Sequence, residues 1–199
     1  MNGTPSAESS PQARGWSRRA CRGLLRLFGW RAVLVPLPGP KGVIMVYPHT
    51  SNWDFIVGIL YRHGVGLPAN WMGKDSLFRG SVGALFRRLG GIPINRRERQ
   101  GVVAALIDVF RERDVIWLAI APEGTRSRVD RLKSGFYQLA LGANVPCGLG
   151  YIDYATRTIG IDTYVQFSGD EDADLRRLRE FYSTKKGRRS ELAGTIAFR

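Results

Sequence analysis

Residues 42–60 read GVIMVYPHTSNWDFIVGIL, and this stretch decides the fold. Its first residues are almost all apolar, as in a buried strand, and Pro48 ends the run because proline cannot continue a strand ladder. From Ser51 onward the apolar residues return at helical spacing. They are Trp53, Phe55, Ile56, Ile59 and Leu60. A buried strand followed directly by a helix is the repeating step of an α/β domain.

The same alternation continues along the chain. Further strand patterns occupy residues 70–72, 92–94, 115–121, 145–151 and 158–166. Helical patterns occupy residues 77–89, 101–111, 134–141 and 172–182. Because strands separated by helices usually pack as a parallel sheet, we predict an α/β fold with a mostly parallel central sheet flanked by helices.

The N-terminal region has a different pattern. Residues 1–13 are rich in Ser, Pro and Gly and are predicted to be a disordered tail. Residues 14–35 are predicted to hold an amphipathic membrane-interface helix, expected over Arg14–Arg31, and residues 36–199 the globular domain. One side of this helix carries Arg18, Arg19, Arg22 and Arg26, and the other carries Trp16, Ala20, Leu24, Leu27 and Phe28. The pattern is typical of an interfacial anchor, and docking of the apolar side on the domain is the alternative.

Composition narrows the function further. The 199 residues include 30 Lys and Arg against 17 Asp and Glu, a net charge of +13, which favours an anionic partner: nucleic acid, a phosphorylated substrate or an anionic lipid surface. The longest apolar run, residues 115–121, is far shorter than the roughly 20 residues that span a bilayer. We therefore expect a cytoplasmic protein that is dissolved or lies on a membrane. Cys21 and Cys147 are far apart, which predicts two reduced thiols and no metal site.

The first candidate for chemistry is His49 with Asp54. His49 follows a strand end and precedes a helix start, so it lies at the carboxyl edge of the sheet, where ligands of α/β folds bind. If Ser51 caps the helix, Asp54 lies in its first turn. A carboxylate bound to one imidazole nitrogen fixes the tautomer and leaves the other nitrogen free as a base. Alternatively, Ser51 and Asp54 form a capping box, and Asp54 only binds helix amides.

Two further segments follow predicted strands. Residues 90–97, GGIPINRR, bring Arg96 and Arg97 to a strand end, where guanidinium groups can bind a phosphate; a solvated basic loop is the alternative. Residues 121–127, APEGTRS, place an acid, a glycine, a hydroxyl and an arginine after the most apolar strand. An ordinary turn is the alternative there.

In this order, the His-x4-Asp motif, the Gly-rich segment ending in Arg and the Glu-Gly-Thr-Arg-Ser segment resemble the glycerolipid acyltransferases. The similarity covers residues from about Lys41 to about Tyr151 and is to the 1-acyl-sn-glycerol-3-phosphate acyltransferase-like enzymes. These enzymes move a fatty acyl group from acyl-CoA or acyl carrier protein to a lysolipid hydroxyl. The resemblance implies no metal and no cofactor beyond the acyl donor.

The resemblance also implies roles for individual residues. His49 would be the general base, Asp54 would orient it, and Arg96 would hold the acceptor's phosphate. The acceptor site would be lined by Glu123, Gly124, Thr125 and Arg126, with Arg126 as a second phosphate contact. The chain departs from the common pattern at Pro48 and Pro93, and the fourth motif, residues 145–150, lacks its second proline.

The expected function is therefore O-acylation of a lysophospholipid, with 1-acyl-glycerol-3-phosphate giving phosphatidic acid in phospholipid biosynthesis. The expected partners are membrane surface lipids, the lysophospholipid acceptor and acyl-CoA or acyl carrier protein, on the inner face of the membrane. One alternative keeps this chemistry on another lysolipid, such as lyso-ornithine lipid. The other is a non-enzymatic nucleic-acid-binding module, although the sequence shows no helix-turn-helix, zinc knuckle or RNA-recognition motif.

Overall fold

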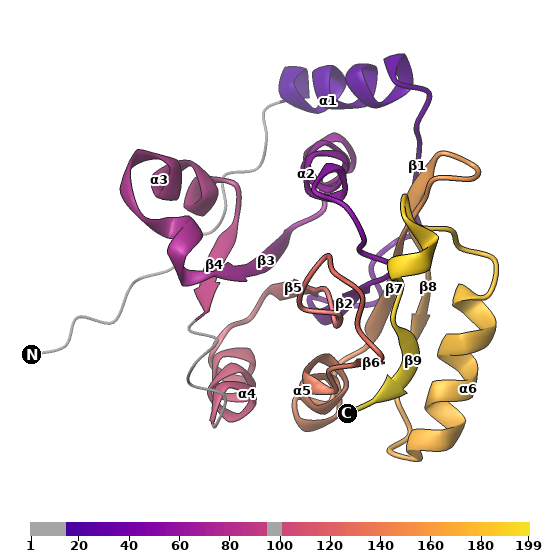
Figure 1. Ribbon diagram of the computed structural model, residues 1–199. Coiled ribbons are helices and arrows are strands. Elements are labelled where there is room, and N and C mark those ends of the chain that lie inside the picture. Colours follow the sequence, from indigo (N-terminus) through magenta and orange to yellow (C-terminus); the bar gives the residue numbers. More distant parts are fainter. Residues whose placement is uncertain (1–14, 95–100) are drawn as a thin grey trace, which may run out of the picture.

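The computed structural model describes residues 15–94 and 101–199. Its centre is a seven-stranded sheet in the order β1-β8-β7-β2-β5-β3-β4 (Figure 1). The strands are β1 (Arg31–Leu34), β2 (Lys41–Val46), β3 (Ala69–Lys74), β4 (Gly91–Ile94), β5 (Ile116–Ile120), β7 (Cys147–Asp153) and β8 (Thr158–Val165). A small second sheet pairs β6 (Arg131–Leu132) with β9 (Thr195–Phe198).

The helices are α1 (Gly15–Leu27), α2 (Trp53–Val65), α3 (Gly80–Arg88), α4 (Val102–Glu112), α5 (Gly135–Gly142) and α6 (Glu171–Tyr182). Two short 3-10 turns, η1 (Asp75–Phe78) and η2 (Ser190–Leu192), complete the elements. β7, β2, β5, β3 and β4 run parallel, β8 runs antiparallel to β7, and β1 is parallel to β8. The predicted α/β fold with a mostly parallel central sheet is confirmed.

Alternation along β2 divides the core into two layers. Val43 and Met45 pack with Phe110 of α4 and Phe136 of α5 on one face of the sheet. Ile44 packs on the other face with the buried residues of α2. Figure 1 shows the same arrangement, with α1 and α2 above the sheet and α4 and α5 below it. Because both faces are covered, the central strands are nearly all apolar.

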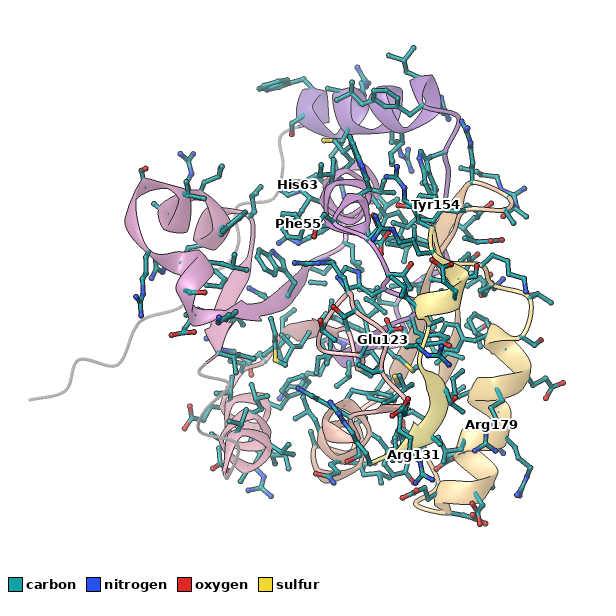
Figure 2. The ribbon with its side chains drawn as sticks, viewed as in Figure 1. Phe55, His63, Glu123, Arg131, Tyr154 and Arg179 are labelled. Atoms are coloured by element: carbon teal, nitrogen blue, oxygen red, sulfur yellow. The ribbon has the colours of Figure 1, made fainter. Side chains whose placement is uncertain are left out.

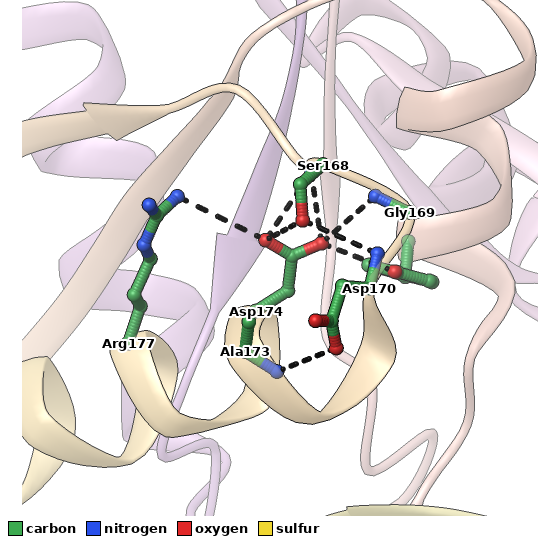
Figure 3. Close-up of polar contacts among 7 residues, drawn as sticks. Ser168, Gly169, Asp170, Ala173, Asp174 and Arg177 are labelled. Atoms are coloured by element: carbon green, nitrogen blue, oxygen red, sulfur yellow. Dashed lines mark hydrogen bonds and ion pairs between the residues drawn. The ribbon is translucent and has the colours of Figure 1, made fainter.

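The start of α6 is fixed by two carboxylates (Figure 3). Asp170 is the N-cap, and its side chain accepts the Ala173 N–H at 3.0 Å. Asp174 is buried and accepts the backbone N–H groups of Ser168 and Gly169. These bonds set the direction of the chain between β8 and α6. They therefore also limit where the residues after α6 can lie against the sheet.

The N-terminal region differs from the prediction. The helix ends at Leu27 rather than Arg31, because Gly29 takes a φ of +75° and its N–H turns back to Arg26. Residues 31–34 then form β1 beside β8, so the interface helix does not fill residues 14–35 and part of that range belongs to the sheet. The short strands β6 and β9 were also not predicted. The predicted tail, residues 1–13, lies outside the described residues.

α1 docks on α2, but not through its apolar side. Leu25 is buried, and the guanidinium of Arg18 donates to the carbonyl of Val65 at 3.4 Å. The apolar residues Trp16, Leu24, Leu27 and Phe28 are 43% to 78% exposed. The expected alternative, docking through the apolar side, is therefore wrong. Within the described ranges, no helix has the length and apolar character needed to cross a bilayer.

Candidate active site

His49 lies in residues 47–52, between β2 and α2, and we name this segment the catalytic loop after the predicted base that it carries. Its Nδ1 lies 3.3 Å from Oδ2 of Asp54, and the imidazole is 17% exposed. The contact is close enough for charge attraction. Its angle falls outside hydrogen-bond limits, so the buried Nδ1 has no aligned partner among the described residues. With Nδ1 turned to the carboxylate, Nε2 is left to take a proton.

Asp54 satisfies both interpretations made from the sequence. Its carboxylate faces His49, and Oδ2 also accepts the N–H groups of Thr50 at 2.8 Å and Ser51 at 2.9 Å. Asp54 is only 2% exposed, and these loop amides supply the hydrogen bonds that a buried carboxylate needs. The residue before the helix is Asn52 rather than Ser51. The Asp54 side chain thus binds the backbone of the catalytic loop and also faces His49.

Tyr154 is a site residue that the sequence did not indicate. Its hydroxyl donates to Oδ1 of Asp54 at 2.8 Å, and its ring packs edge-on against Trp30 with centroids 4.9 Å apart. Burial, followed by the hydrogen bond to Asp54, raises the pKa of Tyr154. Tyr154 follows β7, which is parallel to β2 and next to it, so both strands end at the same edge. A predicted pairing of β7 with β2 would have indicated Tyr154 as a residue of this site.

Glu123 does not line the acceptor site as predicted. Its carboxylate is 2% exposed and lies in the interior beside the C-terminal strand (Figure 2). Oε2 accepts the backbone N–H of His49 at 2.6 Å, and Oε1 accepts the N–H of Gly194 at 3.1 Å. Burial raises the pKa of Glu123, and the two N–H donors only partly offset this effect. Glu123 therefore binds backbone N–H groups. The Glu-Gly-Thr-Arg-Ser motif predicted the position of Glu123 in the chain but not the direction in which its side chain points.

The residues that follow Glu123 do line the cavity. Gly124, Thr125 and Arg126 form its wall near His49. Gly124 has a φ of +67°, and a Cβ there would lie 2.9 Å from Nζ of Lys133, so the turn requires glycine. The Arg126 side chain is exposed at this wall. Arg96 lies outside the described residues, whereas Ile94 at the end of β4 lines the same cavity.

The cavity has a volume of 1570 Å³ and is bounded mainly by apolar side chains. Phe55, Trp71 and Phe86 form one part of the wall, with ring centroids 4.8 to 5.8 Å apart. His49, Asp54 and Arg126 supply polar groups. The volume exceeds the roughly 300–1,000 Å³ of a typical small-ligand pocket. An apolar wall beside a base suits a substrate with a long hydrocarbon part.

Cys147 and Pro146 are not part of this site. Cys147 is fully buried in β7, and burial raises the pKa of its thiol to about 12, so a thiolate nucleophile is absent at neutral pH. Pro146 precedes β7, and its carbonyl accepts the N–H of Val43 near the start of β2. Because His49 follows the end of β2, Pro146 lies at the opposite edge of the sheet.

The fold and the site can be compared with known proteins. A family model described as Acyltransferase matches residues 35–150, more than half of the chain. The chain belongs to the acyltransferase family. Among solved structures, it is similar to the 1-acyl-sn-glycerophosphate (LPA) acyltransferase PlsC from Thermotoga maritima, with a TM-score of 0.57 and 16% identity. The alignment covers 87% of this chain and 80% of PlsC, and at this identity it shows a shared fold.

No curated protein sequence gives a significant match. As a member of the acyltransferase family, the protein is an acyl-transferring enzyme, which excludes the non-enzymatic alternative. The resemblance to the glycerolipid acyltransferases is confirmed. The part that matches the acyltransferase family contains His49, Asp54 and Glu123. It does not contain Tyr154 or Gly194, which complete the hydrogen bonds of this site.

Proposed function

We propose that this acyltransferase moves a fatty acyl group from acyl-CoA or acyl carrier protein to the hydroxyl of a lysophospholipid. The proposed acceptor is 1-acyl-glycerol-3-phosphate, and the product is phosphatidic acid. The observation that carries the proposal is one cavity in which His49 and Asp54 lie beside an apolar wall and an exposed guanidinium, that of Arg126. The proposed base, acyl site and phosphate site would thus share one cavity.

In this mechanism, Nε2 of His49 takes the proton of the acceptor hydroxyl while its oxygen attacks the thioester carbonyl carbon. Asp54 orients the ring and stabilises the imidazolium. The tetrahedral intermediate then breaks its C–S bond, and the imidazolium returns the proton to the leaving thiolate. Because a thioester is already activated, a positioned base is sufficient, and the mechanism requires neither a metal or cofactor nor a covalent acyl-enzyme.

The acceptor's phosphate is assigned to Arg96 and Arg126, because guanidinium groups bind phosphate with paired, charge-assisted hydrogen bonds. Gly124 and Thr125 would line the acceptor site between Arg126 and the base. Glu123 takes a different role from the one expected, since its buried carboxylate holds the backbone of His49. It would act on the reaction through the position of the base.

We place the enzyme on the inner, cytoplasmic face of the membrane as a peripheral protein. The exposed apolar side of α1 supports this proposal, because its Trp, Leu and Phe side chains have no protein to cover them in the described chain. Arg19 and Arg26, which are exposed on α1, would meet anionic headgroups, whereas Arg18 is held by the Val65 carbonyl of the domain. A surface-bound enzyme can reach both a lysolipid in the bilayer and a donor in solution.

The test is turnover by the purified protein with acyl-CoA and acyl carrier protein, each against a lysolipid panel. The panel includes 1-acyl-glycerol-3-phosphate and lyso-ornithine lipid, which carries a carboxylate in place of the phosphate. We expect the highest kcat/KM with 1-acyl-glycerol-3-phosphate. His49→Ala should lower kcat by at least 10²-fold. Equal turnover by His49→Ala and wild type would overturn the mechanism, and a preference for lyso-ornithine lipid would overturn the acceptor.

A further inference from the structure

The chain after α6 returns across the catalytic loop. The C-terminal segment, residues 183–194, contains the basic run Lys185, Lys186, Arg188 and Arg189. Lys185 packs its ammonium 4.1 Å from the centroid of the Tyr151 ring. In Figure 1 this segment passes beside the connection between β2 and α2. The proposed function uses none of these basic residues.

The backbone of this segment is held at three points around the active site. The Lys186 N–H donates to Asp153, the Arg189 N–H donates to the hydroxyl of Thr50 at 3.1 Å, and the Gly194 N–H donates to Glu123. Gly187 packs so closely that a Cβ there would lie 2.8 Å from Oγ1 of Thr50. Gly187 therefore fixes the segment against the catalytic loop, and Arg188 and Arg189 are the next two residues along the chain.

The guanidinium groups of Arg188 and Arg189 are available to bind another partner. Arg189 lines the same cavity as His49 and Arg126, and Arg188 lies 5.4 Å from the ring centroid of Trp53, at the start of α2. Both side chains are exposed. Within the part of the chain that the structure describes, neither forms an ion pair, in contrast to Arg177, which pairs with Asp174 (Figure 3). Arg189 thus brings to the cavity a guanidinium that forms no ion pair with a described residue.

We propose that Arg189, with Arg188 beside it, binds a phosphate group of a substrate in this cavity. The inference rests on the proposed function and adds to it a phosphate ligand from outside the three motifs. A guanidinium presents a fork of N–H donors that matches phosphate oxygens, and a cation without a carboxylate partner loses no ion pair when it binds one. The phosphate belongs either to the acceptor's headgroup or to the phosphorylated arm of the acyl donor.

The test compares ligands that differ only in phosphate. Dissociation constants are measured for 4′-phosphopantetheine against pantetheine, and for a short-chain 1-acyl-glycerol-3-phosphate against the matching monoacylglycerol. Arg189→Gln should weaken one phosphate ligand by about tenfold or more, while its phosphate-free counterpart binds as to wild type. Arg189→Lys should restore part of the loss. Because Arg189 contacts the catalytic loop through its backbone N–H, these substitutions leave that bond in place.

Arg176→Gln is the matched control, since Arg176 is exposed on α6 and does not line the cavity. A loss confined to 4′-phosphopantetheine assigns Arg189 to the donor, and a loss confined to the acceptor assigns it to the headgroup. Unchanged binding of both phosphate ligands overturns the inference. These are binding measurements, so a wild-type protein that binds but transfers no acyl group contradicts the proposed function and not the phosphate site.

Discussion

The carboxylate of Glu123 accepts the backbone N–H of His49 at 2.6 Å. The acid of the Glu-Gly-Thr-Arg-Ser segment therefore binds the main chain of His49, the proposed base. Its other oxygen accepts the N–H of Gly194, so one buried side chain joins the catalytic loop, the turn after β5 and the chain before β9. The precision of the site depends on this junction.

Glu123→Gln tests the junction. Its side-chain oxygen can accept one of the two N–H groups, but its NH₂ cannot accept the other, which leaves a buried donor unsatisfied. We expect a loss of about 1–3 kcal/mol in the free energy of unfolding and a lower kcat with a small change in KM. Urea unfolding and steady-state kinetics measure both. A variant as stable and active as wild type would contradict the role of this carboxylate.

The pH dependence of stability gives a second readout for Glu123. Burial raises its pKa above the ordinary value of 4.5, so the folded protein binds the proton more tightly than the unfolded chain does. The resulting stabilisation is present below pH 4.5 and is lost as the pH rises through the folded pKa. Relative to Glu123→Gln, wild type should thus lose stability as the pH rises above 4.5. A flat or rising difference would show that the pKa is not raised.

Tyr154→Phe removes the hydroxyl that donates to Asp54. The Thr50 and Ser51 amides keep the carboxylate in place, but it accepts one bond fewer and is held less firmly beside His49. We expect kcat/KM to fall by about tenfold. Tyr164→Phe is the matched control, because its hydroxyl donates to the Val35 carbonyl. Equal kcat/KM values for the two variants would remove Tyr154 from the site.

Gly124→Ala places a Cβ at a φ of +67° and 2.9 Å from Nζ of Lys133. Gly101→Ala imposes a similar backbone, φ +84°, with no atom within 4 Å among the described residues. Both should lose about 1–2 kcal/mol of stability, the cost of a left-handed alanine. Only Gly124→Ala should also lower kcat/KM, because it shifts the cavity wall. Equal kinetic effects would indicate that the wall does not contact substrate.

The double variant Leu27→Ser/Phe28→Ser tests membrane attachment by α1. Each side chain is more than half exposed, so stability should change little. Binding to anionic vesicles should fall by more than tenfold, since burying one large apolar side chain contributes about 1.5–3 kcal/mol. Val115→Ser, at an apolar residue that is 60% exposed before β5, serves as the control. Unchanged sedimentation with vesicles would place the membrane contact elsewhere.

The sequence was most informative where function follows from local spacing. The five-residue step from His49 to Asp54 crosses one loop and the first turn of a helix, so spacing alone placed the carboxylate near the base. The strand patterns of β2 and β5 were equally clear, because burial on both faces leaves few polar residues in them.

Other features depend on tertiary structure and could not be predicted in this way. Tyr154 reaches Asp54 from 100 positions away, through the pairing of β7 with β2. The direction of the Glu123 side chain depends on Gly194, which no motif contains. β1 was assigned to the interface segment because its four residues show no periodicity that separates a short edge strand from a helix end.

The contacts of the C-terminal segment also set the order of events during synthesis. The hydroxyl of Tyr47, next to the catalytic loop, donates to the carbonyl of Gly194, 147 positions later. A ribosome that adds about 5–20 residues per second makes the two ends of this bond roughly 7 to 30 seconds apart. The loop that carries the base is therefore among the earliest parts of the sheet to be made and among the last to be fixed. The candidate active site of the nascent enzyme is therefore not settled until Gly194 has been added.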